Sequence, residues 1–334
     1  MNQFDVLDSH RLFLQLVPVI PGELYLATRL NYPVFIYENI AFKQVIPSGE
    51  VPSRDAIANL IRHQVKEVFL HPSDAGVIKS NLQQALVKTT RSLSIGDPIE
   101  NGEKHIKLLL LNLNSLYHDP HNEELLRLHF QSGQNLSKFF LENKKLHSHF
   151  FQNTQKEMFH FTILQPMLSS MLLSSFLQSI RLFHDKEIES LFLTSYLKDI
   201  GIGLIPEDKF DVKNLTIDER QLFAQHADFS YELLDGRVPL SKNHLAIVKH
   251  HHFLNNRLKR ILAKEKWKSN PEMVFGLEST LVGLADIIIA MVSGRPYRQP
   301  LSMYQSLEII RKMIAEEYPQ EFKALVIFLR QFFK

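Results

Sequence analysis

The segment LADIIIAMVSGRPYR, residues 284–298, places one acidic side chain inside an apolar run. Asp286 is the only charged residue in LVGLADIIIAMV (281–292), and a buried carboxylate is costly unless it is paired, hydrogen-bonded or bound to a metal. The same argument applies to Asp199 in LFLTSYLKDIGIGLIP (191–206), where Lys198 is the only other charge. Each Asp is therefore a candidate site residue, with capping of a neighbouring helix as the alternative.

Three histidines in the same half of the chain follow inward-facing patterns. His226 comes after a capping box at 216–219 and lies on an apolar helical stripe. In the next His-rich segment, His251 and His252 each continue an apolar stripe of the preceding helix. Adjacent helix residues point about 100° apart, so both can line one site only where several helices wall it. Ordinary core packing or a surface triplet is the alternative, but the three His and two Asp together favour a metal site.

Composition limits the chemistry that the chain can perform. Its 334 residues suggest two domains, and 38 basic against 36 acidic residues give a net charge of +2. This balance excludes a generally basic nucleic-acid binder, so we expect no DNA partner. The chain has no Cys, which excludes disulfide scaffolds, zinc fingers and thiol nucleophiles. A metal would be held by His and carboxylate groups, a donor set that suits iron, manganese or zinc.

The predicted fold class is α+β. Residues 1–100 predict a small mixed α/β domain, residues 101–154 a helical connector, and residues 155–334 an all-α bundle. Within the first domain, strand signals lie at 11–19, 24–38 and 66–71, and helices are expected at 54–65 and 74–93. Ser53 and Ser73 are the expected N-caps of those two helices.

No targeting segment is expected. Asp5 and Asp8 lie where a signal peptide needs a basic start and an apolar run. The most apolar stretch, 164–177, contains Pro and four Ser and is too short and polar to span a bilayer. We therefore expect a soluble cytoplasmic protein without membrane insertion.

Four segments resemble a known family in order and approximate spacing: KDIGIGLIPEDKF (198–210), LTIDERQLFAQHADFSYELL (215–234), AIVKHHHF (246–253) and LADIIIAMVSGRPYR (284–298). They are similar to the HD-GYP domain, the helical HD-superfamily domain of bacterial cyclic-di-GMP phosphodiesterases. The resemblance covers about residues 155–320. It implies a His and Asp cage for two metals, usually iron or manganese, and cyclic-di-GMP as the ligand.

The resemblance also implies roles for individual residues. Five positions match the metal ligands of the family: Asp199, His226, His251, His252 and Asp286. Asp199 matches the carboxylate that bridges the two metals. Arg295 and Arg298 match basic positions near the phosphates of the bound nucleotide.

Other family positions differ in this sequence. Lys198 stands where the family has the His of its HD pair, and a protonated ammonium is not a metal ligand. Ile202 and Phe253 stand where the family has a Lys and a Glu, and residues 253–271 lack the Gly-Tyr-Pro signature. A two-metal mechanism needs both ions, so these changes argue against efficient diester hydrolysis.

One metal position is also incomplete on another helix. The early His of the family would fall near Gln165 and Pro166, and the nearest candidates to replace it are His160 and Glu157. We therefore expect one iron or manganese ion rather than two. Alternatively, the Lys198 ammonium replaces the positive charge of the metal, and the site holds no ion.

Three hypotheses of different classes follow. The first is a degenerate HD-GYP protein that is weakly active or inactive and acts by binding cyclic-di-GMP or a protein. The second is an unconventional metal-dependent cyclic-di-GMP phosphodiesterase, and the third is a scaffold or interaction protein. The basic stretch 257–268, with Trp267, is either a rim for a dinucleotide or protein partner, or a solvated segment. The N-terminal domain is the expected place for regulation, a protein partner or homodimer formation.

Overall fold

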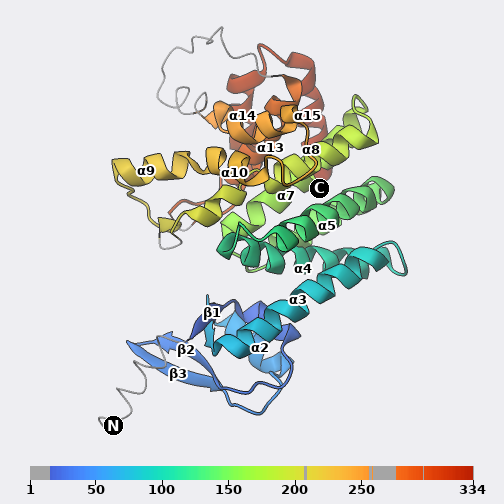
Figure 1. Cartoon of the computed structure of the whole chain (residues 1–334). Coiled ribbons are helices and arrows are strands. Elements are labelled where there is room, and N and C mark those ends of the chain that lie inside the picture. Colours follow the sequence, from blue (N-terminus) through green and yellow to red (C-terminus); the bar gives the residue numbers. More distant parts are fainter. Residues whose placement is uncertain (1–15, 207–208, 256–257, 259–275, 296, 334) are drawn as a thin grey trace. The chain divides into compact units, whose positions relative to one another are not determined.

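The computed structural model describes residues 16–333, apart from 207–208, 256–257, 259–275 and 296. The chain divides into two compact units, Met1–Lys88 and Thr89–Lys334, which are described here one by one (Figure 1). The start of the predicted strand 11–19 lies outside the described residues, as does the basic stretch 257–268 with Trp267, apart from Leu258.

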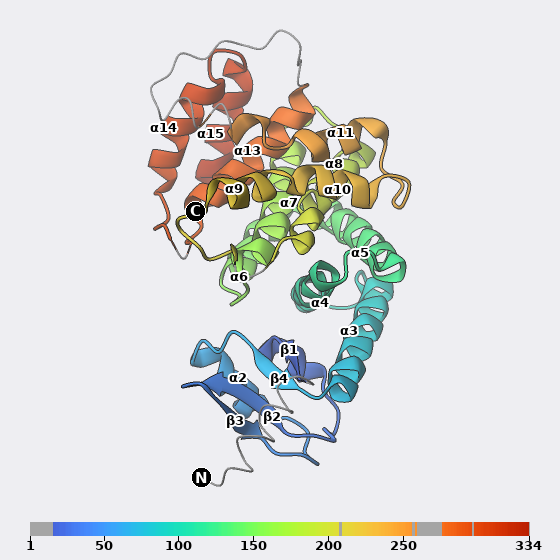
Figure 2. The same cartoon turned by 60° about the vertical axis from the view of Figure 1, so that its left-hand side comes forward.

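The first unit is built on a four-stranded antiparallel sheet in the order β1-β4-β2-β3 (Figure 2). The strands are β1 (Val17–Val19), β2 (Val34–Glu38), β3 (Ala41–Ile46) and β4 (Val68–Leu70). Val34, Val68 and Leu70 are fully buried on one face, and the half-buried Phe35 and Phe69 pair directly on the other. With the helices that follow, this sheet confirms the α+β class.

Three helices complete the first unit: η1 (Pro21–Leu26), α2 (Arg54–Arg62) and α3 (Pro72–Ser92), whose last residues belong to the second unit. Ser53 caps α2 as predicted, because its side chain accepts a hydrogen bond from the Ala56 N–H at 3.1 Å. The predicted cap at Ser73 is wrong. α3 already begins at Pro72, and the Ser73 hydroxyl bonds instead to Nδ1 of His71 at 2.9 Å.

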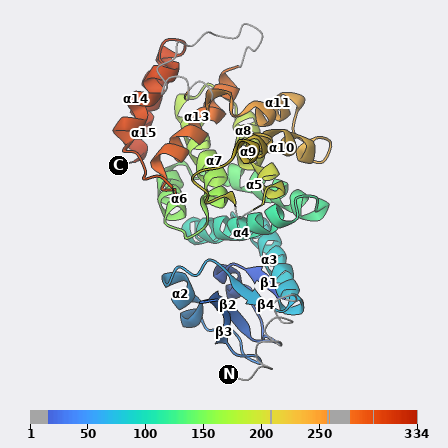
Figure 3. The same cartoon turned by 90° about the vertical axis from the view of Figure 1, so that its left-hand side faces the viewer.

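The second unit is a bundle of helices (Figure 3). Its first half contains α4 (Pro98–His118), α5 (Glu123–Glu142), η2 (Lys144–Leu146), α6 (His147–Gln155), α7 (Phe161–Ile180) and α8 (Asp185–Leu197). Its second half contains η3 (Ile200–Leu204), α9 (Ile217–Ala224), α10 (His226–Leu234), α11 (Lys242–His250), α13 (Leu277–Val292), α14 (Met303–Ile314) and α15 (Pro319–Phe332).

Helix α7 is the centre of this bundle. It packs against α8 and α13, and also against α4, α5, α6 and α15. In the part of the chain that the structure describes, it is the one helix with the length and apolar composition to cross a membrane, but 72% of that window is buried inside the unit. A helix that is apolar on all sides is expected at the centre of a bundle, so burial by its neighbours accounts for its composition.

Three histidines are buried in the first half of the bundle: His105, His129 and His147. Each ring has a hydrogen-bonding neighbour. His105 lies 3.2 Å from the Ser132 carbonyl, His129 lies 2.8 Å from the Tyr196 hydroxyl, and His147 lies 2.6 Å from the Phe140 carbonyl. Burial lowers the pKa of all three imidazoles to about 4, so they are neutral in the folded protein at neutral pH.

Candidate functional site

The predicted site residues come from the ends of three helices and the middle of a fourth. Lys198 and Asp199 follow α8, His226 is the first residue of α10, and His251 and His252 follow α11. Asp286 lies in the middle of α13. These elements pack on one another, because α11 contacts α8, α10 and α13. All of these side chains are buried except that of His252, which is half-buried.

The helix that carries His226 differs from the predicted one. The capping box of Thr216 and Glu219 is confirmed at the start of α9, but α9 ends at Ala224 and α10 begins at His226. The predicted stripe therefore crosses a break at Gln225. His226 is nevertheless buried, with 7% of its surface exposed.

Gly201 allows α10 to approach η3 closely. A Cβ on Gly201 would lie 2.3 Å from the His226 carbonyl oxygen and 2.6 Å from the Ser230 nitrogen. The Gly201 N–H also donates to the Ser230 hydroxyl at 2.9 Å. The absent side chain thus lets His226 approach Asp199, which immediately precedes η3.

We predict that Gly201→Ala lowers the free energy of unfolding by about 3 kcal/mol or more, because backbone atoms must move to make room. Thermal unfolding of the purified variant checks this. Gly76→Ala is the matched control, since a Cβ there has no neighbour within 4 Å and helical Ala is preferred to Gly. An equal melting temperature for Gly201→Ala and the wild type would contradict the close packing.

Three imidazole rings meet beside Asp199. One nitrogen from each of His226, His251 and His252 lies within 4.8 Å of the others. The Asp199 Oδ1 atom is 3.4 Å from Nε2 of His226 and 3.1 Å from Nε2 of His251. Nε2 of His252 is 2.9 Å from Nε2 of His226. Burial, together with the neighbouring His251 and His226, lowers the pKa of His252 well below its usual range.

The backbone hydrogen bonds of His226 and His251 leave the Nε2 atom of each ring without a proton. Nδ1 of His226 donates to the Phe223 carbonyl at 2.5 Å, and Nδ1 of His251 donates to the Val248 carbonyl at 2.6 Å. A neutral imidazole with its proton on Nδ1 has a lone pair on Nε2. Within the described part of the chain, Nε2 of His251 has no partner of hydrogen-bonding geometry.

The donor set therefore fits a cation. The Nε2 lone pair of His251 faces the Asp199 carboxylate at 3.1 Å, and acceptors that face one another repel unless a positive charge lies between them. Backbone carbonyls that hold Nδ1–H are also the usual outer partners of metal-bound His. Iron, manganese and zinc all accept this combination of imidazole and carboxylate.

The other side of Asp199 is occupied by an ammonium group. Nζ of Lys198 forms an ion pair with Asp199 Oδ2 and lies 2.7 Å from Asp286 Oδ1. Burial by itself lowers the pKa of Lys198, but the charges of Asp199 and Asp286 outweigh it and raise this pKa above its ordinary value. Burial likewise raises the pKa of Asp199, but the charge of Lys198 outweighs it and holds this pKa well below its usual range.

Gln165 on α7 is a partner of Asp286 that the sequence did not assign to the site. Its side-chain amide donates to Asp286 Oδ1 at 2.7 Å, and its carbonyl oxygen accepts a hydrogen bond from Arg295. The Arg295 guanidinium lies over the ring of Phe161, 3.9 Å from its centre. In the sequence, Gln165 could have been recognised as a polar side chain in an apolar helix, near the position where the HD-GYP resemblance predicts a His.

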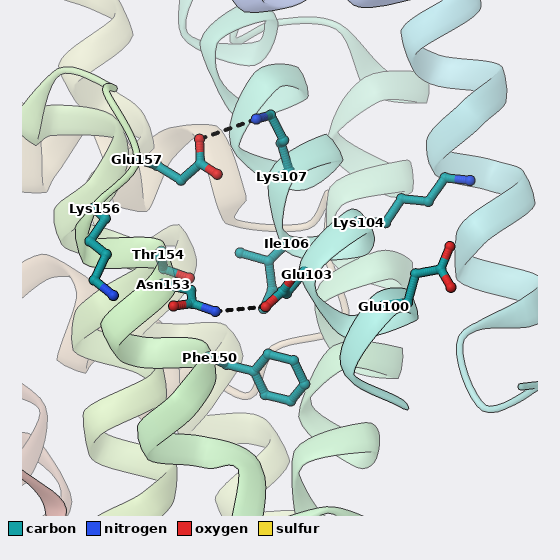
Figure 4. A pocket seen from close by; sticks show the side chains of 10 residues that line it. All are labelled: Glu100, Glu103, Lys104, Ile106, Lys107, Phe150, Asn153, Thr154, Lys156 and Glu157. Carbon is teal, nitrogen blue, oxygen red and sulfur yellow. Dashed lines mark hydrogen bonds and ion pairs between the residues drawn. The ribbon is translucent and has the colours of Figure 1, made fainter. Parts of the chain in front are cut away.

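The side chains of the remaining candidates bond to other partners. Arg298 donates to the Ala290 carbonyl. His160 caps α7 and lies 2.9 Å from the Asp211 carboxylate. Glu157 pairs with Lys107 at 3.4 Å in a cavity of about 570 Å³ between α4 and α6 (Figure 4). In the structure, Gln165 rather than His160 or Glu157 contacts Asp286.

Comparison with solved structures gives a similarity of fold. No family model and no curated protein matches the chain. Among solved structures, the chain is similar to Bd1817, an HDG"Y"P protein from Bdellovibrio bacteriovorus, with a TM-score of 0.62 and 12% sequence identity. The alignment covers 94% of this chain and 99% of Bd1817.

The chain has the HD-GYP fold. At 12% identity the similarity concerns the fold and not the activity. Independently of this similarity, the group of His226, His251 and His252 supplies donor atoms that could hold a metal ion.

Proposed function

We propose that this chain is a degenerate HD-GYP protein of cyclic-di-GMP signalling, one that binds the nucleotide and hydrolyses it slowly or not at all. The observation that carries the proposal is the position of the Lys198 ammonium between Asp199 and Asp286. A second divalent ion next to this buried cation would be repelled, and the HD-GYP resemblance requires that ion for efficient hydrolysis.

The proposal includes one metal ion, iron or manganese, held by His226, His251, His252 and Asp199. A cation in that position would neutralise and polarise a phosphate oxygen of the ligand. Asp286 is excluded from this set, because its Oδ1 is already bound by Lys198 and Gln165. The proposed ligand set therefore contains four of the five residues that the sequence suggested.

Arg295 is the favoured phosphate-binding residue. Its guanidinium is joined through Gln165 to Asp286, so it stands at the edge of the cluster. Arg298 is a weaker candidate, because its guanidinium donates to the Ala290 carbonyl. Arginine favours phosphate because its planar donors match the oxygens in pairs.

We predict about one iron or manganese ion per chain, and none in His226→Ala, because a metal site is sensitive to the loss of one of few ligands. Elemental analysis of freshly purified protein measures the content. His121→Ala is the matched control, since His121 is exposed in the loop between α4 and α5 and should leave the content unchanged. Two ions per chain, together with rapid hydrolysis of cyclic-di-GMP, would overturn the proposal.

A second candidate function is an unconventional metal-dependent cyclic-di-GMP phosphodiesterase. The convergence of His226, His251, His252 and Asp199 favours it, because this half of the centre is complete. Turnover that His226→Ala abolishes would support this candidate. Turnover that survives the substitution would come from a contaminating enzyme.

We also propose a cytoplasmic location and three functional segments. Residues 1–100 would regulate the protein or mediate contact with a protein partner or a second copy. Residues 101–154 would form a helical connector, and residues 155–334 would form the HD-GYP-like domain. Deletion of residues 1–100 that changes neither nucleotide affinity nor oligomeric state would contradict this division.

A further inference from the structure

We propose that a row of aromatic side chains next to the site binds a purine base of the cyclic dinucleotide by stacking. This inference rests on the proposed function, since it names the group that recognises the bases of the same ligand. The row, called the aromatic shelf below, consists of five residues: His160, Phe161, Phe210, Phe223 and Tyr297.

The five rings of the aromatic shelf form a continuous series. Phe223 and Phe210 meet edge to face with ring centres 6.1 Å apart, and Phe210 stacks on His160 at 5.8 Å. His160 in turn lies 4.2 Å from Phe161, and Phe161 meets Tyr297 at 6.4 Å. Residues from four separate places in the chain therefore contribute to one aromatic surface.

Both ends of the shelf are tied to the candidate site. At one end, the Phe223 carbonyl accepts the Nδ1–H of His226. Next to the other end, which is Tyr297, Phe161 lies under the Arg295 guanidinium, which bonds to Gln165 and through it to Asp286. A ligand with phosphates at the cluster would therefore have its bases within reach of these rings.

The shelf is neither a closed core nor a loose surface. Tyr297 is 40% exposed, and the other four rings are half-buried. The His160 ring is fixed at both nitrogens, by Thr162 at 2.8 Å and by Asp211 at 2.9 Å. A rigid, partly open aromatic face is what base stacking requires, because every nucleobase has a π-face and little ordering entropy is lost.

Charge complementarity selects the occupant. The cation site and Arg295 lie beside the shelf, so the ligand that fits both features joins a planar ring to an anionic group. A purine nucleotide has this combination. An apolar peptide would use the rings but bring no anionic group to the cation site or to Arg295.

The test compares ligands with and without a base on metal-loaded full-length protein. Calorimetry measures the affinities of cyclic-di-GMP, GMP and ribose 5-phosphate for the wild type, Phe210→Ala and Tyr297→Ala. We expect each variant to bind cyclic-di-GMP and GMP about tenfold more weakly, since alanine in place of a stacking ring costs about 1–3 kcal/mol per base. Ribose 5-phosphate affinity should stay within about twofold. Tyr304→Ala is the control, because Tyr304 is 74% exposed on α14.

The outcomes separate this inference from the proposed function. The Tyr297 side chain is exposed enough for Tyr297→Ala to fold normally. Unchanged cyclic-di-GMP affinity in this variant would contradict base stacking on the aromatic shelf but would not contradict the proposed function. Equal weakening for ribose 5-phosphate would also overturn it, since the loss would not concern the base. If the wild type binds GMP but not cyclic-di-GMP, and the variants bind GMP more weakly, the shelf is supported while the proposed function fails.

Discussion

Replacing Lys198 by methionine should lower the free energy of unfolding of the metal-free protein by about 3–5 kcal/mol, because removal of one partner leaves buried charges uncompensated. Lys198 is 1% exposed and is the ammonium that lies between Asp199 and Asp286. Methionine has a similar length and keeps the packing, so the decrease in the free energy of unfolding reports the contribution of the Lys198 charge. Denaturant titration in the presence of a chelator gives the value.

Manganese should restore part of the stability of Lys198→Met, since the freed carboxylates of Asp199 and Asp286 then offer oxygen ligands to a second ion. The matched control is Lys249→Met. Lys249 is an exposed lysine, 3.6 Å from Asp228, and its substitution should cost less than about 1 kcal/mol. A variant as stable as the wild type in chelator would show that the two carboxylates do not depend on this ammonium.

Acid should unfold the protein in the range between about pH 6.5 and pH 4. His105, His129 and His147 have a pKa of about 4 in the folded state and an ordinary value of 6.5 in the unfolded chain. Because the folded pKa is the lower one, their contribution is complete above pH 6.5 and decreases as protons bind to the unfolded chain. Each shift corresponds to about 3 kcal/mol, and three of them approach the total stability of a typical domain.

The pH prediction is checked by denaturant titrations at pH 7, 6 and 5. His129→Leu should make the loss of stability across this range smaller, because one of the groups with a lowered pKa no longer titrates. His63→Leu should leave the loss unchanged, since His63 is exposed and stays hydrated in both states. A wild-type free energy of unfolding that is the same at pH 7 and pH 5 would contradict neutral burial of the three rings.

The cost of buried charge made the main site residues predictable. Asp199 and Asp286 stood out as carboxylates in apolar helices, and the structure gives both a partner. His226 and His251 were expected to face inward, and both are buried. These inferences needed only local sequence patterns and the unfavourable free energy of burying a charge.

The partners across the bundle were harder to predict. The contact between Gln165 and Asp286 joins residues far apart in the sequence, and its polar signal was a single amide in an apolar helix. The predicted strand run 24–38 was wrong at its start, because Pro21 begins the 3-10 helix η1, which extends to Leu26. The helix that Ser73 was predicted to cap begins earlier, at Pro72, because the fixed backbone angle of Pro suits the first position of a helix.

The charges around Asp199 cancel before any ion is added. Lys198 and Arg295 carry two positive charges, and Asp199 and Asp286 carry two negative ones. A divalent ion at the three histidines would therefore change the local charge from zero to two, and an anionic ligand would bring it back. Metal and nucleotide should thus bind with positive cooperativity, each raising the affinity of the other by the same factor.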